Sequence, residues 1–332
     1  MAHYLGPQDL ERLFAEGIVA PRDCVAAVEA SFREHGAGTS EQLPRRILWA
    51  DAARTTPRDR ALKLSASMMR ASSTFGASVY STHYRPGEVE MWNLVFSGES
   101  GRMEGILNGK LLSLWKTAAT AAVATRHLAR ADAARAALIG TGRYALPQLI
   151  CLAAVRPLAA VRCYSRDAAR LAAFVQRARA ALPGVEVAAA PSARAAVAGA
   201  DVVTTITTAA APVLEGAWLD AGTHVNAMGQ HAPHAREVDT ALVRGARVVV
   251  DTFEQALEEK GELLIPLAEG AIARDHLAAE LGAVVAGRAA GRTAPHETTL
   301  FCSGGTALEY MALARLVVAR ARAAGIGRDL EQ

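Results

Sequence analysis

Hydrophobic residues recur at helical and then at strand-like intervals along the first third of this 332-residue chain. From Pro7 to about His35 apolar side chains are spaced as on helices, so two short helices are expected there. After a loop that ends at Pro44, short runs of strand formers follow. Five strands are expected, at 46–49, 62–68, 77–81, 92–96 and 103–107. Strands joined by short turns, such as the Gly-rich turn 97–101, predict an antiparallel meander.

The rest of the chain has a different rhythm. A helix is expected at 117–129, and apolar runs then alternate with Ala- and Arg-rich stretches of helical period. The runs lie at 136–139, 161–164, 185–188, 202–206, 225–228 and 248–250. Buried strands that alternate with helices predict a doubly wound parallel sheet. One long amphipathic helix, 306–324, follows Gly304 and Gly305, and it either caps this sheet or packs back on the N-terminal part.

Composition narrows the class of protein. The chain is 51% hydrophobic and 21% charged, with 36 basic and 33 acidic side chains. No Lys/Arg-rich block occurs, so a nucleic-acid partner is not expected. The four cysteines lack metal-site spacing, and we expect reduced core thiols and no bound metal. No signal peptide and no apolar stretch of about 18 residues is found, which predicts a cytoplasmic protein without a membrane partner. Lysine is scarce: the lysines are Lys63, Lys110, Lys116 and Lys260.

A dinucleotide-binding fingerprint follows the first of the predicted parallel strands. Its residues are Gly140, Thr141, Gly142, Arg143, Tyr144 and Ala145, and a helix is expected to continue from Leu146. In this motif the first glycine allows a tight turn, the second lets the backbone approach a pyrophosphate, and the small third residue allows close helix packing. The alternative is an ordinary glycine turn, but the position between strand and helix favours nucleotide binding.

The end of the second parallel strand bears on the choice of cofactor. An acidic side chain there would hold the ribose hydroxyls of NAD, and a basic one would hold the 2′-phosphate of NADP. Here the strand ends in Ser165 and Arg166, and Asp167 comes one residue later. These residues favour NADP(H), and Asp167 leaves NAD(H) possible.

Several phrases together resemble the ornithine cyclodeaminase and mu-crystallin family. They are Leu112-Ser113-Leu114-Trp115-Lys116-Thr117-Ala118-Ala119, Gly140-Thr141-Gly142, Tyr164-Ser165-Arg166, Ala200-Asp201-Val202-Val203-Thr204-Thr205, Pro212-Val213-Leu214, Val225-Asn226-Ala227-Met228-Gly229, Glu237-Val238-Asp239 and Phe301-Cys302-Ser303-Gly304-Gly305-Thr306-Ala307. The resemblance implies a homodimer in which a Rossmann NAD(P)-binding domain, 121–304, is inserted in an α+β dimerisation and substrate domain, 1–120 plus 305–332. The expected fold class is therefore α/β, with the last helix in the second domain.

The resemblance also implies candidate catalytic residues. Arg46, two residues after Pro44, matches a substrate-binding cation of the family. Lys116 stands where the family has an arginine, and a lysine lacks the two-pronged grip on a carboxylate. Ser78, in the strand that begins at Gly76, replaces the usual catalytic lysine unless Lys63 or His83 reaches the site. His231 replaces the acidic residue of the cyclodeaminases and could act as a general acid near neutral pH.

On the cofactor side, the resemblance points to small and hydroxyl residues at strand ends. They are Thr205, Thr207, Asn226, Met228, Gly229, Ser303 and Gly304. Turn and cap chemistry would explain the same residue types in a chain without a cofactor. We expect contacts with the nicotinamide and its ribose.

Three functions are consistent with these residues. The first is an NADPH-dependent oxidoreductase that reduces a small imino (ketimine) or keto acid to an amino acid. The second is an ornithine cyclodeaminase, an ammonia-lyase that forms proline with bound NAD. The third is a non-catalytic, NADP- and ligand-binding dimer, favoured by the replacements at Ser78, Lys116 and His231. The residues do not name the substrate.

Overall fold

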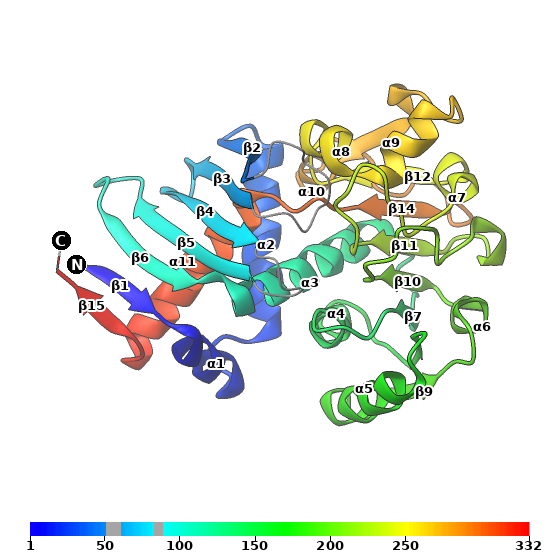
Figure 1. Ribbon diagram of the computed structural model, residues 1–332, viewed down its shortest axis with the longest axis horizontal. Helices are drawn as coiled ribbons and strands as arrows, with labels where there is room; N and C mark the ends of the chain where they lie inside the picture. The colour runs from blue at the N-terminus through cyan, green and yellow to red at the C-terminus, as the bar shows by residue number, and fades with distance from the viewer. Residues whose placement is uncertain (51–60, 83–88, 332) are drawn as a thin grey trace. The chain divides into compact units, whose positions relative to one another are not determined.

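The computed structural model describes residues 1–50, 61–82 and 89–331, and the chain divides into two compact units (Figure 1). Unit 1 consists of Met1–Lys116 and Gly305–Gln332, and unit 2 is the continuous stretch Thr117–Gly304. The chain therefore leaves unit 1 and returns to it. Within the described ranges, no helix has both the length and the apolar character of a bilayer span.

Unit 1 contains a mixed sheet of seven strands in the order β15-β1-β6-β5-β4-β3-β2. The strands are β1 (Ala2–Leu5), β2 (Ser40–Trp49), β3 (Ala61–Met69), β4 (Thr74–Thr82), β5 (Val89–Ser97), β6 (Met103–Asn108) and β15 (Arg328–Leu330). The predicted meander, β2 to β6, is antiparallel throughout. The sequence pattern missed β1 and β15, which pair with each other at one edge, β1 also running parallel to β6.

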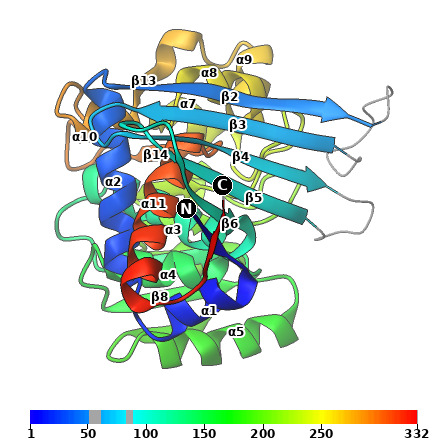
Figure 2. The same ribbon diagram turned by 90° about the vertical axis from the view of Figure 1, so that its left-hand side faces the viewer.

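Three helices belong to this sheet: α1 (Pro7–Ala15), α2 (Pro21–Gly36) and α11 (Ala307–Ala324). Helices α2 and α11 lie side by side, and α11 packs on β3, β4 and β5 (Figure 2). A Cβ at Gly76 of β4 would lie 2.5 Å from Met311 Sδ and 2.0 Å from Leu94 O. Only glycine permits so close an approach. The last helix thus packs back on the N-terminal part, one of the two expected alternatives.

The prediction that a loop ends at Pro44 was wrong, because Pro44 lies inside β2. Strand β2 is the edge strand next to β3, and its register shifts between Leu43 and Arg46. A proline cannot donate a ladder hydrogen bond, but an edge strand with a bulge tolerates it. The predicted strand, 46–49, is shorter than β2 because proline is rare in strands and was taken to end the loop before it.

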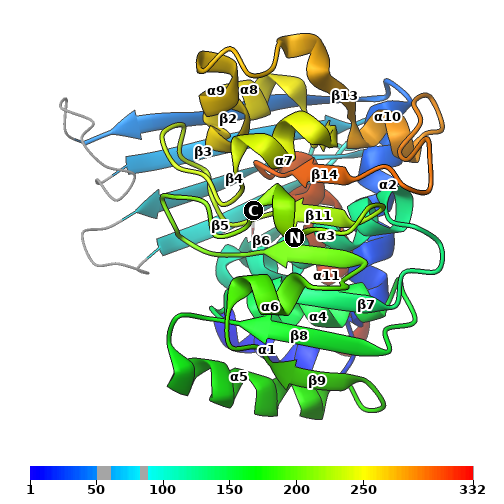
Figure 3. The same ribbon diagram turned by 90° about the vertical axis from the view of Figure 1, so that its right-hand side faces the viewer.

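Unit 2 contains an all-parallel sheet of eight strands in the order β13-β12-β14-β11-β10-β7-β8-β9 (Figure 3). The strands are β7 (Arg135–Ile139), β8 (Ala160–Tyr164), β9 (Glu186–Ala189), β10 (Val202–Thr205), β11 (His224–Ala227), β12 (Arg247–Val250), β13 (Leu277–Glu280) and β14 (Thr299–Cys302). The predicted Rossmann-like parallel sheet is confirmed. Its strand order reverses between β7 and β10, the place where such sheets bind ligands.

Helices cover both faces of this sheet. They are α3 (Gly109–Leu128, which begins in unit 1), α4 (Ala145–Ala153), α5 (Ala168–Ala181), α6 (Ala193–Val197), α7 (Thr240–Gly245), α8 (Phe253–Glu259), α9 (Gly261–Ala268) and α10 (Leu281–Val285). Leu149 of α4 and Phe174 of α5 share one core with Val161. Leu242 of α7 and Leu263 of α9 share the other with Val225 and Val250. Because both faces of the sheet are covered, side chains on both sides of each strand are apolar, and the strand sequences are continuous hydrophobic runs.

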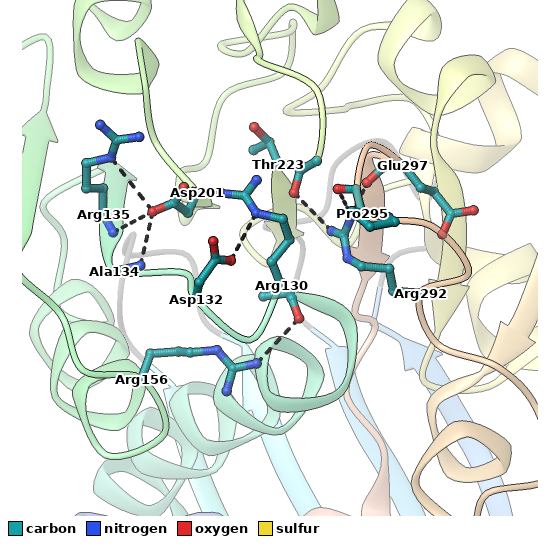
Figure 4. Close-up of polar contacts among 12 residues, drawn as sticks. Arg130, Asp132, Ala134, Arg135, Arg156, Asp201, Thr223, Arg292, Pro295 and Glu297 are labelled. Atoms are coloured by element: carbon teal, nitrogen blue, oxygen red, sulfur yellow. Dashed lines mark hydrogen bonds and ion pairs between the residues drawn. The ribbon is translucent and has the colours of Figure 1, made fainter.

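Charged side chains close the amino edge of the parallel sheet (Figure 4). Asp201 accepts hydrogen bonds from the backbone N–H groups of Ala134 and Arg135 and forms an ion pair of 2.5 Å with Arg130. Burial by itself would raise the pKa of Asp201, but these donors and the guanidinium outweigh it and lower the pKa. This network lies at the amino ends of the strands, and the candidate site lies at their carboxyl ends.

Candidate active site

The Gly140–Ala145 loop leaves the carboxyl end of β7 next to β10. Gly140 has φ +109°, and a Cβ there would lie 2.5 Å from Ile206 O, so the turn requires glycine. At Gly142 no atom lies within 4 Å of a Cβ position. Ala145 is fully buried at the start of α4, consistent with the close helix packing expected of the third small residue.

The fit of a dinucleotide rests on two further observations at this place. The N-cap residue of α4, Tyr144, makes no side-chain cap hydrogen bond among the described residues, and its ring lies 5.1 Å from the guanidinium of Arg143. Thr205, at the end of β10, has a buried hydroxyl with no hydrogen-bond partner among the described residues. A helix N-terminus attracts a pyrophosphate, and a buried hydroxyl needs a polar partner. The residues present therefore fit the cofactor, with Thr141 half-buried in the same loop.

Three residues after β8 were assigned to the adenosine ribose. Ser165 is half-buried and Arg166 is exposed. Asp167 caps α5, since its Oδ1 accepts from Arg170 N at 3.0 Å and its Oδ2 lies 3.1 Å from Arg170 Nε. The carboxylate that left NAD possible therefore already has a helix-capping role.

The carboxyl ends of β10 and β11 are joined through a buried carboxylate. Glu237 Oε1 accepts from the backbone N–H and the hydroxyl of Thr207, at 2.6 and 2.8 Å. Its Oε2 accepts from Gly229 N at 2.6 Å. Burial and the nearby Glu262 raise the pKa of Glu237, although the Thr207 and Gly229 donors counter this. A Cβ at Gly229 would lie 2.2 Å from Thr207 O, so only glycine fits at this crossing.

The side chain of Asn226 is engaged inside unit 2. Its Nδ2 donates to Thr125 Oγ1 at 2.9 Å, and its Oδ1 lies 3.1 Å from Nε2 of the buried His224. The Nδ2 contact ties α3 to β11 and the Oδ1 contact stays within β11, so Asn226 has a structural role that the resemblance did not suggest. Met228 is buried, and its N–H donates to Thr205 O.

The predicted pair after β14 lies close to two residues beyond β12. Ser303 Oγ donates to Asp251 Oδ2 at 3.1 Å. A Cβ at Gly304 would meet the side chain of Gln255 at 3.4 Å, an ordinary contact. Ser303 and Gly304 are therefore at the carboxyl edge of the sheet, as a contact with the nicotinamide would require.

His231 is exposed in the loop that follows β11. Beneath this loop lie residues that the sequence analysis did not select. Lys260 is fully buried. Its Nζ donates to Gln230 O and lies 3.2 Å from Glu262 Oε2. Burial by itself would lower the pKa of Lys260, but Glu262 and Glu237 raise it, so the ammonium stays charged. A signal was available, since one of only four lysines is followed by the apolar run 263–265.

In unit 1, Lys116 is buried, which excludes a solvent-facing role. Its Nζ lies 3.6 Å from Glu309 Oε2 and 4.7 Å from the centre of the Tyr310 ring. A Cβ at Gly305 would lie 2.5 Å from the same Nζ. Arg45 reaches this place as well, because its Nη2 donates to Gly305 O at 3.2 Å.

Arg46 lies elsewhere on β2. It is exposed and pairs in register with Leu64 of β3. Arg45, the residue before Arg46, is therefore the arginine that lies near Lys116. The register shift between Leu43 and Arg46 could not be read from a count of residues after the proline, and the role of Arg46 stays a prediction.

Ser78 is fully buried on β4, and its hydroxyl donates to Asn93 Oδ1. It pairs in register with Ser65 of β3. Lys63, two residues from Ser65, places its Nζ 5.6 Å from the centre of the Tyr80 ring. Ser78 thus provides a hydroxyl where the family has the ammonium of a lysine. Lys63, on the neighbouring strand β3, is the described lysine that could replace it. His83 lies outside the described residues.

No metal site is found in the part of the chain that the structure describes, where no three His, Cys, Asp or Glu side chains could hold an ion together. The four cysteines are buried and form no disulfide among the described residues. Burial raises the pKa of Cys24 and of Cys163 to about 12, so both stay protonated thiols.

Comparison with known proteins adds the following. The sequence profile of the ornithine cyclodeaminase/mu-crystallin family matches residues 14–325. A Δ(1)-pyrroline-2-carboxylate reductase of Bacillus cereus (strain ATCC 10987) is 35% identical over 236 residues, 70% of this chain and 71% of that protein. The structure of Thermococcus litoralis Δ(1)-pyrroline-2-carboxylate reductase with NADH and L-proline has a TM-score of 0.90 and 30% identity, covering 99% of this chain and 100% of that chain. An archaeal alanine dehydrogenase dimer with bound NAD has a TM-score of 0.89 and 25% identity, covering 99% of each chain.

Proposed function

Because this chain belongs to the ornithine cyclodeaminase/mu-crystallin family, we propose that it is an NAD(P)H-dependent reductase of a small imino acid. The first candidate substrate is Δ(1)-pyrroline-2-carboxylate, which would give proline. The reductases of Bacillus cereus and Thermococcus litoralis support this substrate by their similarity. A keto acid with an amine is the second candidate, supported by the alanine dehydrogenase.

One observation favours imine reduction rather than ornithine cyclisation. The loop after β11 presents the exposed imidazole of His231 where the resemblance places a carboxylate in the cyclodeaminases. A carboxylate is suited to bind an ammonium substrate, whereas an imidazolium can donate a proton to an imine nitrogen. Protonation makes the imine carbon a better hydride acceptor, so His231 supports the reductive direction.

The chemistry divides between the cofactor and the chain. The reduced nicotinamide supplies a hydride to the imine carbon, and one proton on nitrogen completes the amine. Gly140–Ala145 would hold the pyrophosphate, and the backbone around Thr207 and Gly229 would fix the nicotinamide end. Arg45 and Lys116 would supply positive charge for the substrate carboxylate in unit 1. Ser78 is fully buried and its hydroxyl donates to Asn93 Oδ1, so it supplies no charge to the substrate.

The cofactor preference and the assembly are finer parts of the proposal. Asp167 is engaged at the start of α5, and Ser165 and Arg166 precede it, which favours NADPH. The Thermococcus litoralis enzyme holds NADH, so NADH is the alternative. A homodimer is supported by the archaeal relative and by exposed leucines on the outer face of β2 and β3. We assign dimerisation and substrate binding to unit 1 and the nucleotide to unit 2.

The test is an assay of the purified protein. With Δ(1)-pyrroline-2-carboxylate, NADPH or NADH should be consumed and proline should appear in equal amounts. Release of ammonia from ornithine would instead identify a cyclodeaminase. Binding of either nucleotide without turnover on cyclic imines, or on pyruvate with ammonia, would identify a non-catalytic binding protein.

A further inference from the structure

Loop 229–237, which carries His231, is held at both of its ends by buried side chains. At the first end, Gly229 N donates to Glu237 Oε2, and Gln230 O accepts from Lys260 Nζ. At the second end, Glu237 N donates to Glu262 Oε1 at 3.1 Å. Lys260 therefore binds the carbonyl of the residue directly before His231, and Glu262 links that lysine to the far end of the loop.

The same loop rests directly on the backbone of α9. A Cβ at Gly261 would lie 2.0 Å from Ala235 O and 2.8 Å from Ala232 O. No side chain fits between the helix start and the loop. The segment Lys260–Glu262 thus supports the loop with one backbone contact and two charged side chains.

These side chains form a charged cluster that water does not reach. Lys260, Glu262 and Glu237 are each fully or almost fully buried, and the cluster holds one ammonium and two carboxylates. Cys302 of β14 interacts electrostatically with all three side chains, and Asp251 after β12 acts on Cys302. A buried carboxylate that loses its cation is strongly disfavoured, and Glu237, whose pKa burial and Glu262 already raise, is then the group expected to take up a proton.

We propose that Lys260, Glu262 and Glu237 are positioning residues that hold loop 229–237, and with it His231 and the Gly229 backbone, in the arrangement required for reduction. This inference rests on the proposed function. None of the three side chains needs to touch the substrate. Lys260 acts through the Gln230 carbonyl, and the carboxylates act through the loop N–H groups.

The experiment separates two effects of Lys260 on the loop: its charge in the buried cluster and its hydrogen bond to Gln230 O. Three full-length variants are compared: Lys260→Met, Lys260→Met with Glu262→Gln, and the control Lys110→Met, which removes an exposed lysine paired with Glu90. Hydrogen exchange of peptides covering 229–237 is measured from about pH 6 to about pH 9 and normalised to the control. The pH profiles of kcat and KM for imine reduction are measured in parallel.

In Lys260→Met, loop exchange should rise on the order of 10-fold at about pH 9 and less at about pH 6, where Glu237, with its raised pKa, is expected to keep a proton. Its kcat should fall on the order of 10-fold to 100-fold with the same pH dependence, and KM for the nucleotide should change little. The double variant has the same net buried charge as the wild type, so the pH dependence should disappear. Its loop exchange should stay raised, because Gln230 O still lacks its donor.

Two results would overturn the inference. One is loop exchange in both Lys260 variants equal to that of the control. The other is an equal rise in all peptides of unit 2, which indicates general loss of stability and not release of one loop. If the wild-type protein reduces no imine, the proposed function fails, but the exchange measurement still decides whether Lys260 holds the loop. If the single variant does not fold, the charge-matched double variant supplies the same comparison.

Discussion

Lys116 Nζ lies 3.6 Å from Glu309 Oε2, and the two side chains are 4% and 0% exposed. The same carboxylate oxygen accepts from Thr306 N and Thr306 Oγ1 at 2.6 and 2.7 Å. The residue that caps the start of α11 is therefore also the counterion of the lysine proposed to bind the substrate. Because two hydrogen bonds from Thr306 hold this carboxylate oxygen, it also fixes the position of the ammonium.

Replacement of Lys116 by methionine should destabilise the protein by about 3 kcal/mol, because a buried carboxylate loses its cation. The measurement is urea unfolding at neutral pH. The double change Lys116→Met with Glu309→Gln should recover much of this loss. The surface change Lys110→Met should cost less than about 1 kcal/mol. Equal changes in the free energy of unfolding for the two lysine substitutions would show that the buried Lys116–Glu309 pair contributes no more than a surface ion pair.

Two glycines of the nucleotide loop should respond differently to alanine. Gly142→Ala adds a methyl group in open space, so the melting temperature should be unchanged while Kd for NADPH rises about ten-fold or more. Gly140→Ala places a side chain at φ +109° against Ile206 O and should cost about 1 to 3 kcal/mol of stability. Fluorescence titration and thermal melts separate the two effects. Unchanged binding in Gly142→Ala would contradict the assigned pyrophosphate position.

Stability should depend on pH through His224. This imidazole is fully buried between Thr299 and Asn226, and burial lowers its pKa to about 3. The unfolded state, with a pKa near 6.5, binds a proton that the folded state does not, so stability is fully present above about pH 6.5. It should fall by up to about 1.4 kcal/mol per pH unit as the pH drops toward 4.

The check on His224 is the difference between the wild type and His224→Gln. Their free energies of unfolding, measured in urea at several pH values, should converge as the pH falls from about 6 to about 4. Other groups titrate in both proteins and cancel in the difference. Parallel curves would mean that His224 does not titrate on unfolding.

Arg166→Ala tests the cofactor preference. If the exposed guanidinium binds the 2′-phosphate, KM for NADPH should rise about ten-fold, and KM for NADH should hardly change. The matched control is Arg170→Ala, which removes the partner of Asp167 in the next turn of the helix. Equal KM changes for both nucleotides would place Arg166 outside the phosphate site.

The outer face of β2 and β3 should be the dimer contact. Leu48 and Leu62 pair in register, are 61% and 40% exposed, and lie near the exposed Leu43. Leu48→Glu should convert a dimer into a monomer in sedimentation experiments, since a buried unpaired charge is costly in an interface. Phe253→Glu, at an exposed apolar position in unit 2, should leave the dimer intact. A dimer that survives Leu48→Glu excludes this face.

The sequence predicted the large features of the fold because they depend on periodicity. The alternation of apolar runs and helices gave the parallel sheet, and the confirmed family gave the fold class. Short strands with ordinary composition were missed, namely β13, β14, the edge strand β15 and its neighbour β1. A four-residue strand has too few positions to show a period, and its pairing is decided by residues far away in the chain.

The glycine turn after β7 could be predicted because the motif fixes its backbone, as at Gly140. The position of Arg45 beside Gly305 could not, because a register shift in β2 and a partner far along the chain decide it. Lys260 is the clearest case, because its carbonyl partner, at Gln230, lies thirty residues earlier. A buried charge network is a property of three-dimensional packing, and spacing along the chain does not reveal it.

The pairing of β1 with β15 has a consequence for the order of folding. Unit 2 is one continuous stretch and can fold as soon as Gly304 has been synthesised. The meander of unit 1 is made first, but α11, which covers β3 to β5, and the outer partner of β1 are made last. During synthesis the covered face of that sheet is therefore exposed for as long as unit 2 takes to appear. This interval is the period of greatest risk of aggregation, and chaperone assistance during synthesis should raise the yield of folded protein.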